Sequence, residues 1–295
     1  MIRRILFAVA ALALSMGALV AGHLGISKTA AAPQHSSKTI TIGNIGWDED
    51  VAVNSLLKVV LTDKLGYTVN LKLADAGPLY QGVASGSLDV FMDTWLPKTQ
   101  ALYWAKYKAK VVKMAPWYTG AANLGLTVPN YSMVHSISQL NAHSSQFGGK
   151  IVGIEPGAGE MNVVQTKVIS GYGLHYTLQG SSTPAMLSAL QRAMKRHQQI
   201  VVTLWKPHWA FTAYPIRYLK DPKGLMGGTE KLSAVVRKGL QKDQPQAYKF
   251  LSHFRLSEQQ LGTLEIQIRK SSSPEAGART WLKTHKSVEM HWMMG

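Results

Sequence analysis

The sequence of 295 residues contains no cysteine. Disulfide bonds, thiolate metal ligands and a thiol nucleophile are therefore excluded, as is membrane anchoring through a lipid-modified cysteine. Acidic residues are scarce, since 16 of them stand against 32 lysines and arginines, and the formal net charge is +16. The basic residues are scattered and no nucleic-acid-binding motif accompanies them, so we predict no nucleic-acid partner. A source adapted to acid surroundings is our hypothesis for this composition.

Motifs of the common catalytic sites are also missing. Neither Gly-x-Ser-x-Gly nor His-Glu-x-x-His occurs, and the ten histidines are dispersed. Catalysis needs a nucleophile with a base, or metal ligands at ligand spacing. We therefore predict a protein that is not an enzyme and that uses neither a metal nor a cofactor. An enzyme acting on a cationic small molecule remains the alternative from another functional class.

The first 32 residues have the layout of a secretory signal. Arg3 and Arg4 precede an apolar stretch over residues 5–22, and small residues follow it. This order predicts a signal peptide over residues 1–32, cleaved near Gly22 or in the Ala30–Ala32 run. An uncleaved membrane anchor is the alternative, because the apolar stretch approaches the length that spans a bilayer. The expected location is the periplasm, without a lipoprotein anchor.

The rest of the chain predicts an α/β protein with two lobes. Residues 39–46, 51–64 and 67–73 read as strand, helix and strand, which implies a parallel pair with a right-handed crossover. Residues 150–204 repeat this order around a glycine turn. We expect a first part of lobe I over residues 39–122, lobe II over 123–213 and a return to lobe I over 214–295, with two crossing segments. The return has mostly helical patterns, at 232–240, 246–254, 257–268 and 273–285.

Three tryptophans stand at or just after strand-like runs. Trp47 follows the first strand, Trp95 follows residues 88–92, and Trp205 follows the apolar run 200–204. Open α/β sheets place their ligands at the carboxyl ends of their strands. A packed aromatic core is the alternative for each tryptophan alone. Together, three indoles could form the walls of a site for one cationic ligand.

A glycine turn, Glu155-Pro156-Gly157-Ala158-Gly159, lies between a strand and a helix. Free backbone N–H groups at a helix start form an anion site. The spacing is not that of a dinucleotide fingerprint and the P-loop lysine is absent. The turn therefore favours a carboxylate, and a plain helix entry is the alternative.

Five segments together resemble the substrate-binding proteins of ABC transporters for glycine betaine, proline betaine and choline. They are residues 45–48, 89–97, 153–159, 203–209 and 218–224, and the resemblance extends over residues 39–270. It implies a two-lobed periplasmic-binding-protein fold, type II-like, with the ligand cleft between the lobes. It also implies a monomer that delivers a quaternary ammonium osmolyte to an ABC permease.

The same resemblance implies a set of ligand contacts. Trp47 and Trp95 of lobe I and Trp205 of lobe II would surround the methylated nitrogen by cation–π attraction. The backbone amides of Gly159 and Glu160 would meet the ligand carboxylate. Some members add a histidine five residues after the second tryptophan, where this chain has Gln100. His208, next to the third tryptophan, is a further candidate, either as a ligand contact or as a structural hydrogen bonder.

Two acidic residues leave the ligand open between betaine and choline. If the side chain of Glu160 faced the cleft, it would repel a carboxylate and favour choline. Glu49 stands where choline-binding relatives place an acid, although a helix-capping acid facing solvent is its simpler interpretation. Those relatives also supply a tyrosine near the position of Leu124, which is absent here. We therefore favour glycine betaine or proline betaine over choline.

Overall fold

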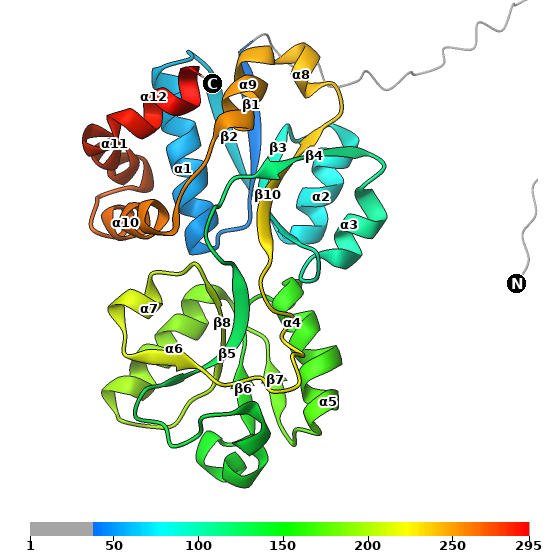
Figure 1. The fold of residues 1–295 in the computed structure, drawn as a ribbon, viewed down its shortest axis with the longest axis vertical. Helices are drawn as coiled ribbons and strands as arrows, with labels where there is room; N and C mark the ends of the chain where they lie inside the picture. The colour runs from blue at the N-terminus through cyan, green and yellow to red at the C-terminus, as the bar shows by residue number, and fades with distance from the viewer. Residues whose placement is uncertain (1–37, 295) are drawn as a thin grey trace, which may run out of the picture. The chain divides into compact units, whose positions relative to one another are not determined.

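The computed structural model describes residues 38–294, and the predicted signal peptide lies outside them. The described chain forms two lobes, each built on one five-stranded sheet (Figure 1). The strand order is β2-β1-β3-β10-β4 in the first sheet and β7-β6-β8-β5-β9 in the second. Within residues 38–294, no helix is both long and apolar enough to cross a membrane.

The first sheet is parallel except for one interior strand, β10 (Lys231–Arg237). β1 (Thr39–Asn44) lies between β2 (Thr68–Leu73) and β3 (Val90–Leu96), and these three strands run in parallel. β10 (Lys231–Arg237) is antiparallel to both β3 and β4 (Val111–Pro116). The sheet therefore receives its fourth strand in spatial order from a distant part of the sequence.

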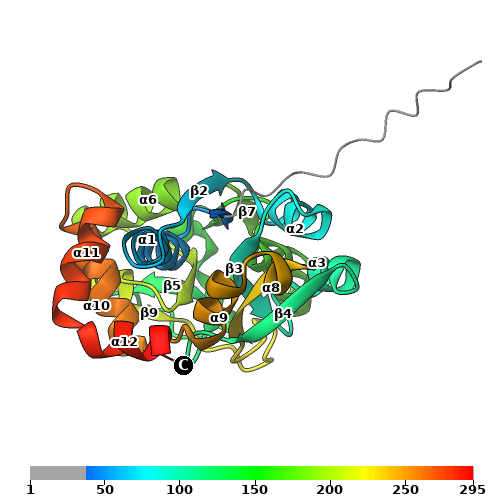
Figure 2. The same cartoon turned by 90° about the horizontal axis from the view of Figure 1, so that it is seen from above.

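Helices cover both sides of this sheet. Figure 2 shows α10, α11 and α12 gathered beside α1, with α2 and α3 on the other side. The helices of this lobe are α1 (Asp48–Asp63), α2 (Ala76–Ser85), α3 (Ala101–Tyr107), α8 (Leu240–Asp243), α9 (Pro245–His253), α10 (Glu258–Arg269), α11 (Pro274–Thr284) and α12 (Lys286–Met294). Since α1 and α2 each join two parallel strands, the first lobe has the predicted strand–helix–strand order.

The second sheet repeats the pattern. β6 (Lys150–Val152) is parallel to β7 (Thr177–Gln179) and to β8 (Val202–Lys206), whereas β5 (Asn123–Pro129) is antiparallel to β8 and to β9 (Ile216–Tyr218). Its helical segments are a 3₁₀ segment (Ile137–Phe147), α4 (Gly159–Val163), a π-helical turn (Val164–Val168), α5 (Ile169–Tyr172), α6 (Thr183–Lys195) and α7 (Ala210–Ala213).

Two segments cross between the lobes, one from β4 to β5 and one from β9 to β10. They pair with each other at Ala122 and Glu230, where the Glu230 N–H donates to the Ala122 carbonyl at 2.7 Å. The return predicted at residue 214 comes too early, because β9 still pairs with β5 in the second sheet. The chain re-enters the first sheet only at β10.

The helix predicted over residues 232–240 is wrong, because most of this stretch forms β10. Residues Leu232 to Arg237 are all buried, since β10 lies between two strands and is covered on both faces. A strand covered in this way has a continuous apolar run instead of alternation. Such a run cannot be told from a buried helix by periodicity alone.

A buried ion pair joins the start of β3 to the end of β10 in the first sheet. Asp89, fully buried before β3, accepts from Arg237 Nε of β10 at 2.7 Å. It also accepts from the backbone N–H of Thr41 in β1 at 2.7 Å. A buried ion pair that loses one partner leaves an uncompensated charge in the interior.

We predict that Asp89→Asn lowers the free energy of unfolding by about 3–5 kcal/mol, measured by urea denaturation. Asp63→Asn is the matched control, because its bidentate pair with Arg279 lies at the surface, 2.9 Å from Nε. Removing that exposed pair should change stability by about 1 kcal/mol or less. Equal losses in the two variants would contradict a special role for the buried pair.

Candidate functional site

The three predicted tryptophans converge on one cavity between the lobes. Trp47 comes directly before α1, Trp95 lies near the end of β3, and Trp205 lies near the end of β8. The cavity is lined by Trp47, Trp95, Thr99, Leu124, Ile154, Glu160 and Trp205. The rings of Trp47 and Trp205 lie 5.7 Å apart between centroids, tilted by 49°. We call Trp47, Trp95 and Trp205 the tryptophan box.

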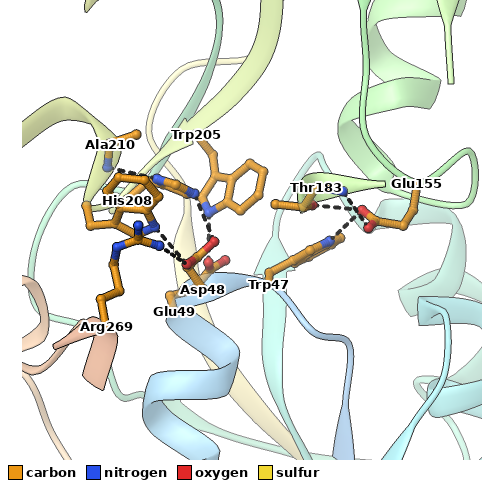
Figure 3. Close-up of polar contacts among 10 residues, drawn as sticks. Trp47, Asp48, Glu49, Glu155, Thr183, Trp205, His208, Ala210 and Arg269 are labelled. Carbon is orange, nitrogen blue, oxygen red and sulfur yellow. Dashed lines mark hydrogen bonds and ion pairs between the residues drawn. The ribbon is translucent and has the colours of Figure 1, made fainter. Parts of the chain in front are cut away.

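Each indole N–H of the tryptophan box donates to a carboxyl group. Trp205 Nε1 donates to Glu49 at 2.8 Å and Trp95 Nε1 to Asp93 at 2.9 Å. Trp47 Nε1 donates to Glu155 at 3.2 Å (Figure 3). The polar edges of the rings are therefore occupied, so that the box offers a ligand its π faces. A cavity walled by indole faces is suited to an alkylated cation.

Two of these bonds join the lobes reciprocally. Trp205 of lobe II is bonded to Glu49 of lobe I, and Trp47 of lobe I is bonded to Glu155 of lobe II. Glu155 is fixed in turn by the backbone N–H and the hydroxyl of Thr183, at 2.8 and 2.9 Å. The orientation of each of these two indoles therefore depends on the opposite lobe.

A second interlobe cluster lies beside the box. Asp48 accepts from Trp209 Nε1 at 2.7 Å and lies 3.2 Å from His208 Nε2. The Arg269 guanidinium stacks 3.4 Å from the centroid of a Trp209 ring. Burial raises the pKa of Asp48, but His208, Trp209 and Arg269 together outweigh it, and the net shift is downward. The cluster thus stabilises the ionised carboxylate.

His208, a predicted candidate, does not line the cavity. Its Nδ1 accepts from the backbone N–H of Ala210 at 3.0 Å, and its ring stands edge-on to Trp205 at 4.9 Å. Of the two interpretations given from the sequence, the geometry fits the structural hydrogen bonder.

Gln100 does not line the cavity either, although the family resemblance implied a contact with the ligand carboxylate at this position. The side chain is fully buried in lobe I, where Oε1 accepts from the Tyr80 hydroxyl at 2.8 Å. Its Nε2 donates to the Asp93 carbonyl at 2.9 Å. The amide is thus engaged in supporting the strand that carries Trp95.

Glu49 is fully buried, so that the interpretation of a solvent-facing helix cap is wrong. Burial, with the charges of Asp93 and Glu265, raises its pKa well above the ordinary value. Burial and the charge of Asp50 raise the pKa of Asp93 in the same direction. The bonds to Trp205 and Trp95 oppose these shifts only in part, so both groups favour the protonated form.

The glycine turn presses against lobe I. A Cβ atom added to Gly159 would lie 2.1 Å from the Thr99 carbonyl oxygen, so only glycine fits this approach. The Tyr103 hydroxyl donates to the Gly157 carbonyl at 2.9 Å. Gly159 and Glu160 are the first residues of α4, where the resemblance placed the amides for a ligand carboxylate.

Thr99, Leu124 and Ile154 line the cavity but were not among the predicted site residues. Thr99 is held by Glu230, which accepts from its hydroxyl and from its backbone N–H at 3.0 Å. Only one feature of the sequence could have identified Thr99 as a cavity residue, namely its position just after the segment that contains Trp95. Glu230 is distant in sequence and had no such signal.

Glu160 lines the cavity while only 2% exposed. Neither carboxyl oxygen has a hydrogen-bond partner of normal geometry in residues 38–294. Burial raises the pKa of Glu160 to about 8, and the neighbouring backbone N–H groups of Leu204 and Gly125 oppose only part of the rise. The carboxyl group is therefore largely protonated at neutral pH.

We predict that this pKa shift makes the unliganded protein less stable as the pH rises from 4.5 to about 8. The folded pKa is raised from 4.5 to about 8, so the stabilising contribution is present below pH 4.5 and lost as the pH rises toward 8. Glu160 alone gives a slope on the order of 1 kcal/mol per pH unit in this window. Chemical denaturation at several pH values should show a shallower slope for Glu160→Gln. Identical slopes would contradict the shift.

Comparisons with known proteins place the chain in a family. The model of the OpuAC family, the substrate binding domain of ABC-type glycine betaine transport systems, matches residues 38–284. The glycine betaine/carnitine transport binding protein GbuC of Listeria monocytogenes is 39% identical over 153 residues. That match spans 51% of this chain and 51% of GbuC, about half the length of each.

Solved structures extend the likeness to both lobes. Lactococcal OpuAC, closed and complexed with glycine betaine, has 35% identity and a TM-score of 0.81, over 87% of this chain and 99% of that one. ProX from Borrelia burgdorferi has 33% identity and a TM-score of 0.81, over 86% and 96%. These structures confirm the predicted two-lobed α/β fold. The chain belongs to the family of substrate-binding domains of ABC-type glycine betaine transport systems.

Proposed function

We propose that this protein captures a quaternary ammonium osmolyte, glycine betaine or proline betaine, and delivers it to an ABC permease. The observation that carries the proposal is the tryptophan box, whose three indoles come from both lobes with every N–H already bonded to a carboxyl group. A desolvated cation over such rings gains ~2 kcal/mol or more from cation–π attraction.

Lobe closure would complete the site. The ring of Trp205 belongs to lobe II while Trp47 and Trp95 belong to lobe I, so separating the lobes takes the box apart. Closure around the ligand excludes water and strengthens the attraction between the cation and the rings. In this proposal the protein acts outside the cytoplasm as a monomer, and it releases the ligand chemically unchanged.

Choline is the second candidate, and the side chain of Glu160 is the observation that favours it. An acid in the cavity wall would repel a ligand carboxylate when ionised and attract a ligand that carries only positive charge. Gln100, turned into the lobe I core, supplies no compensating donor to a carboxylate. Betaine stays ahead because the family and the lactococcal structure are associated with that ligand.

We predict that isothermal titration of the mature protein at neutral pH shows binding of glycine betaine, and weaker binding of choline. The reverse order would identify a choline-uptake protein and give Glu160 the deciding role. Binding of neither would contradict the proposed function. Mass spectrometry of the recovered ligand tests the enzyme alternative, since an altered ligand would reveal turnover.

We predict that Trp205→Ala weakens betaine binding at least about tenfold, because it removes one of the three rings of the box. Trp104→Ala is the matched control, since Trp104 lies on α3 away from the cavity lining. Circular dichroism should show both variants folded. Unchanged affinity in Trp205→Ala would remove this residue from the site.

A further inference from the structure

Glu160 is a buried acid in the cavity wall that lacks any partner for its charge. Its side chain is 2% exposed and lines the same cavity as the tryptophan box. In residues 38–294, neither oxygen accepts a hydrogen bond of normal geometry and no ion pair reaches it. An isolated ionised carboxylate is very costly in such a place. Glu160 is therefore either protonated, or ionised beside a positive charge.

The elements packed around Glu160 supply no such charge. β5 and β8 present the backbone N–H groups of Gly125 and Leu204, and β9 presents the Tyr218 ring. Lys206 of β8 places its ammonium 5.5 Å from the centroid of that ring, without an ion pair to Glu160. Three acids near the box accept from its indoles, namely Glu49 of α1, Asp93 of β3 and Glu155 of the glycine turn. The His208 ring stands edge-on to Trp205, and its Nε2 lies 3.2 Å from Asp48.

A quaternary ammonium group in the cavity would supply a positive charge beside Glu160. It has no N–H to donate and cannot lose its charge by deprotonation, so its positive charge stays fixed inside the cavity. Opposite charges in a water-excluded site attract far more strongly than in bulk water. A cation beside Glu160 therefore favours the ionised carboxylate.

We propose that Glu160 carries a proton in the closed, empty site and loses it when a quaternary ammonium group enters the tryptophan box. The O–H bond of the carboxyl group breaks, the electron pair stays on oxygen and the proton passes to the solvent. Ligand uptake is then an exchange of one cation for one proton. This proposal rests on the proposed function, because it requires a quaternary ammonium ligand.

The number of protons released should depend on the net charge of the ligand. Choline brings only a positive charge, so it should release nearly the whole proton. Glycine betaine also brings a carboxylate, which opposes the ionisation of Glu160 and should reduce the release. The raised pKa of Glu160, about 8 in the empty site, sets the range in which this difference appears. Choline should bind more tightly as the pH rises from 6 to 8, while betaine should gain less or weaken.

The test is isothermal titration in phosphate and in Tris at pH 7, since the difference in observed heat gives the number of protons released. We expect close to ~1 proton for choline in the wild-type protein, and choline affinity about tenfold or more higher at pH 8 than at pH 6. Glu160→Gln should release no proton and show a flat pH profile. Glu258→Gln, at an exposed position on α10, is the control and should behave as the wild type.

Three outcomes would overturn the proposal. Binding of choline by the wild type without proton release would overturn it while leaving the proposed function intact. Equal proton release in Glu160→Gln would assign the proton to another group. Binding of neither ligand would overturn both the proposal and the proposed function. The proton count of the wild type decides the matter even if the Glu160→Gln variant does not fold.

Discussion

The closed arrangement of this protein depends on indole N–H groups that donate to carboxyl groups of the opposite lobe. Trp205 reaches Glu49 and Trp47 reaches Glu155, so each lobe orients an aromatic wall of the other. The three indoles therefore surround one cavity only when the two lobes are in contact. Its rings are aligned by contacts at their edges, which leaves the faces toward the cavity.

Keeping acids behind aromatic rings has an energetic cost. Glu49, Asp93 and Glu160 are all within 2% of complete burial, and burial raises the pKa of each. In a chain with few acidic residues, their concentration here argues for a role in the site rather than in solubility. The Arg269 guanidinium beside the box stacks on Trp209. The protonation of these acids is therefore sensitive to the charge of a ligand in the box.

Much of the fold and the centre of the site could be predicted from the sequence. Trp47, Trp95 and Trp205 could be found because each stands at a strand end, and strand ends meet at one edge of a sheet. Gln100 could not be placed, because one turn of chain after Pro97 decides whether it faces the cleft or Tyr80. β10 resembled a helix because it is covered on both faces. The bonds from Trp205 to Glu49 and from Trp47 to Glu155 join residues over 100 positions apart, and nothing local encodes them.

Glu230 takes part both in the connection between the lobes and in the wall of the cavity. Its backbone pairs with Ala122, where the two crossing segments meet, and its carboxyl group holds Thr99 in the cavity wall. Glu230 therefore links the two crossing segments to Thr99 of the cavity wall. A rotation of the lobes about these segments would act on Glu230 and, through it, on Thr99. The outline of the protein is therefore coupled to the state of its cavity through Glu230.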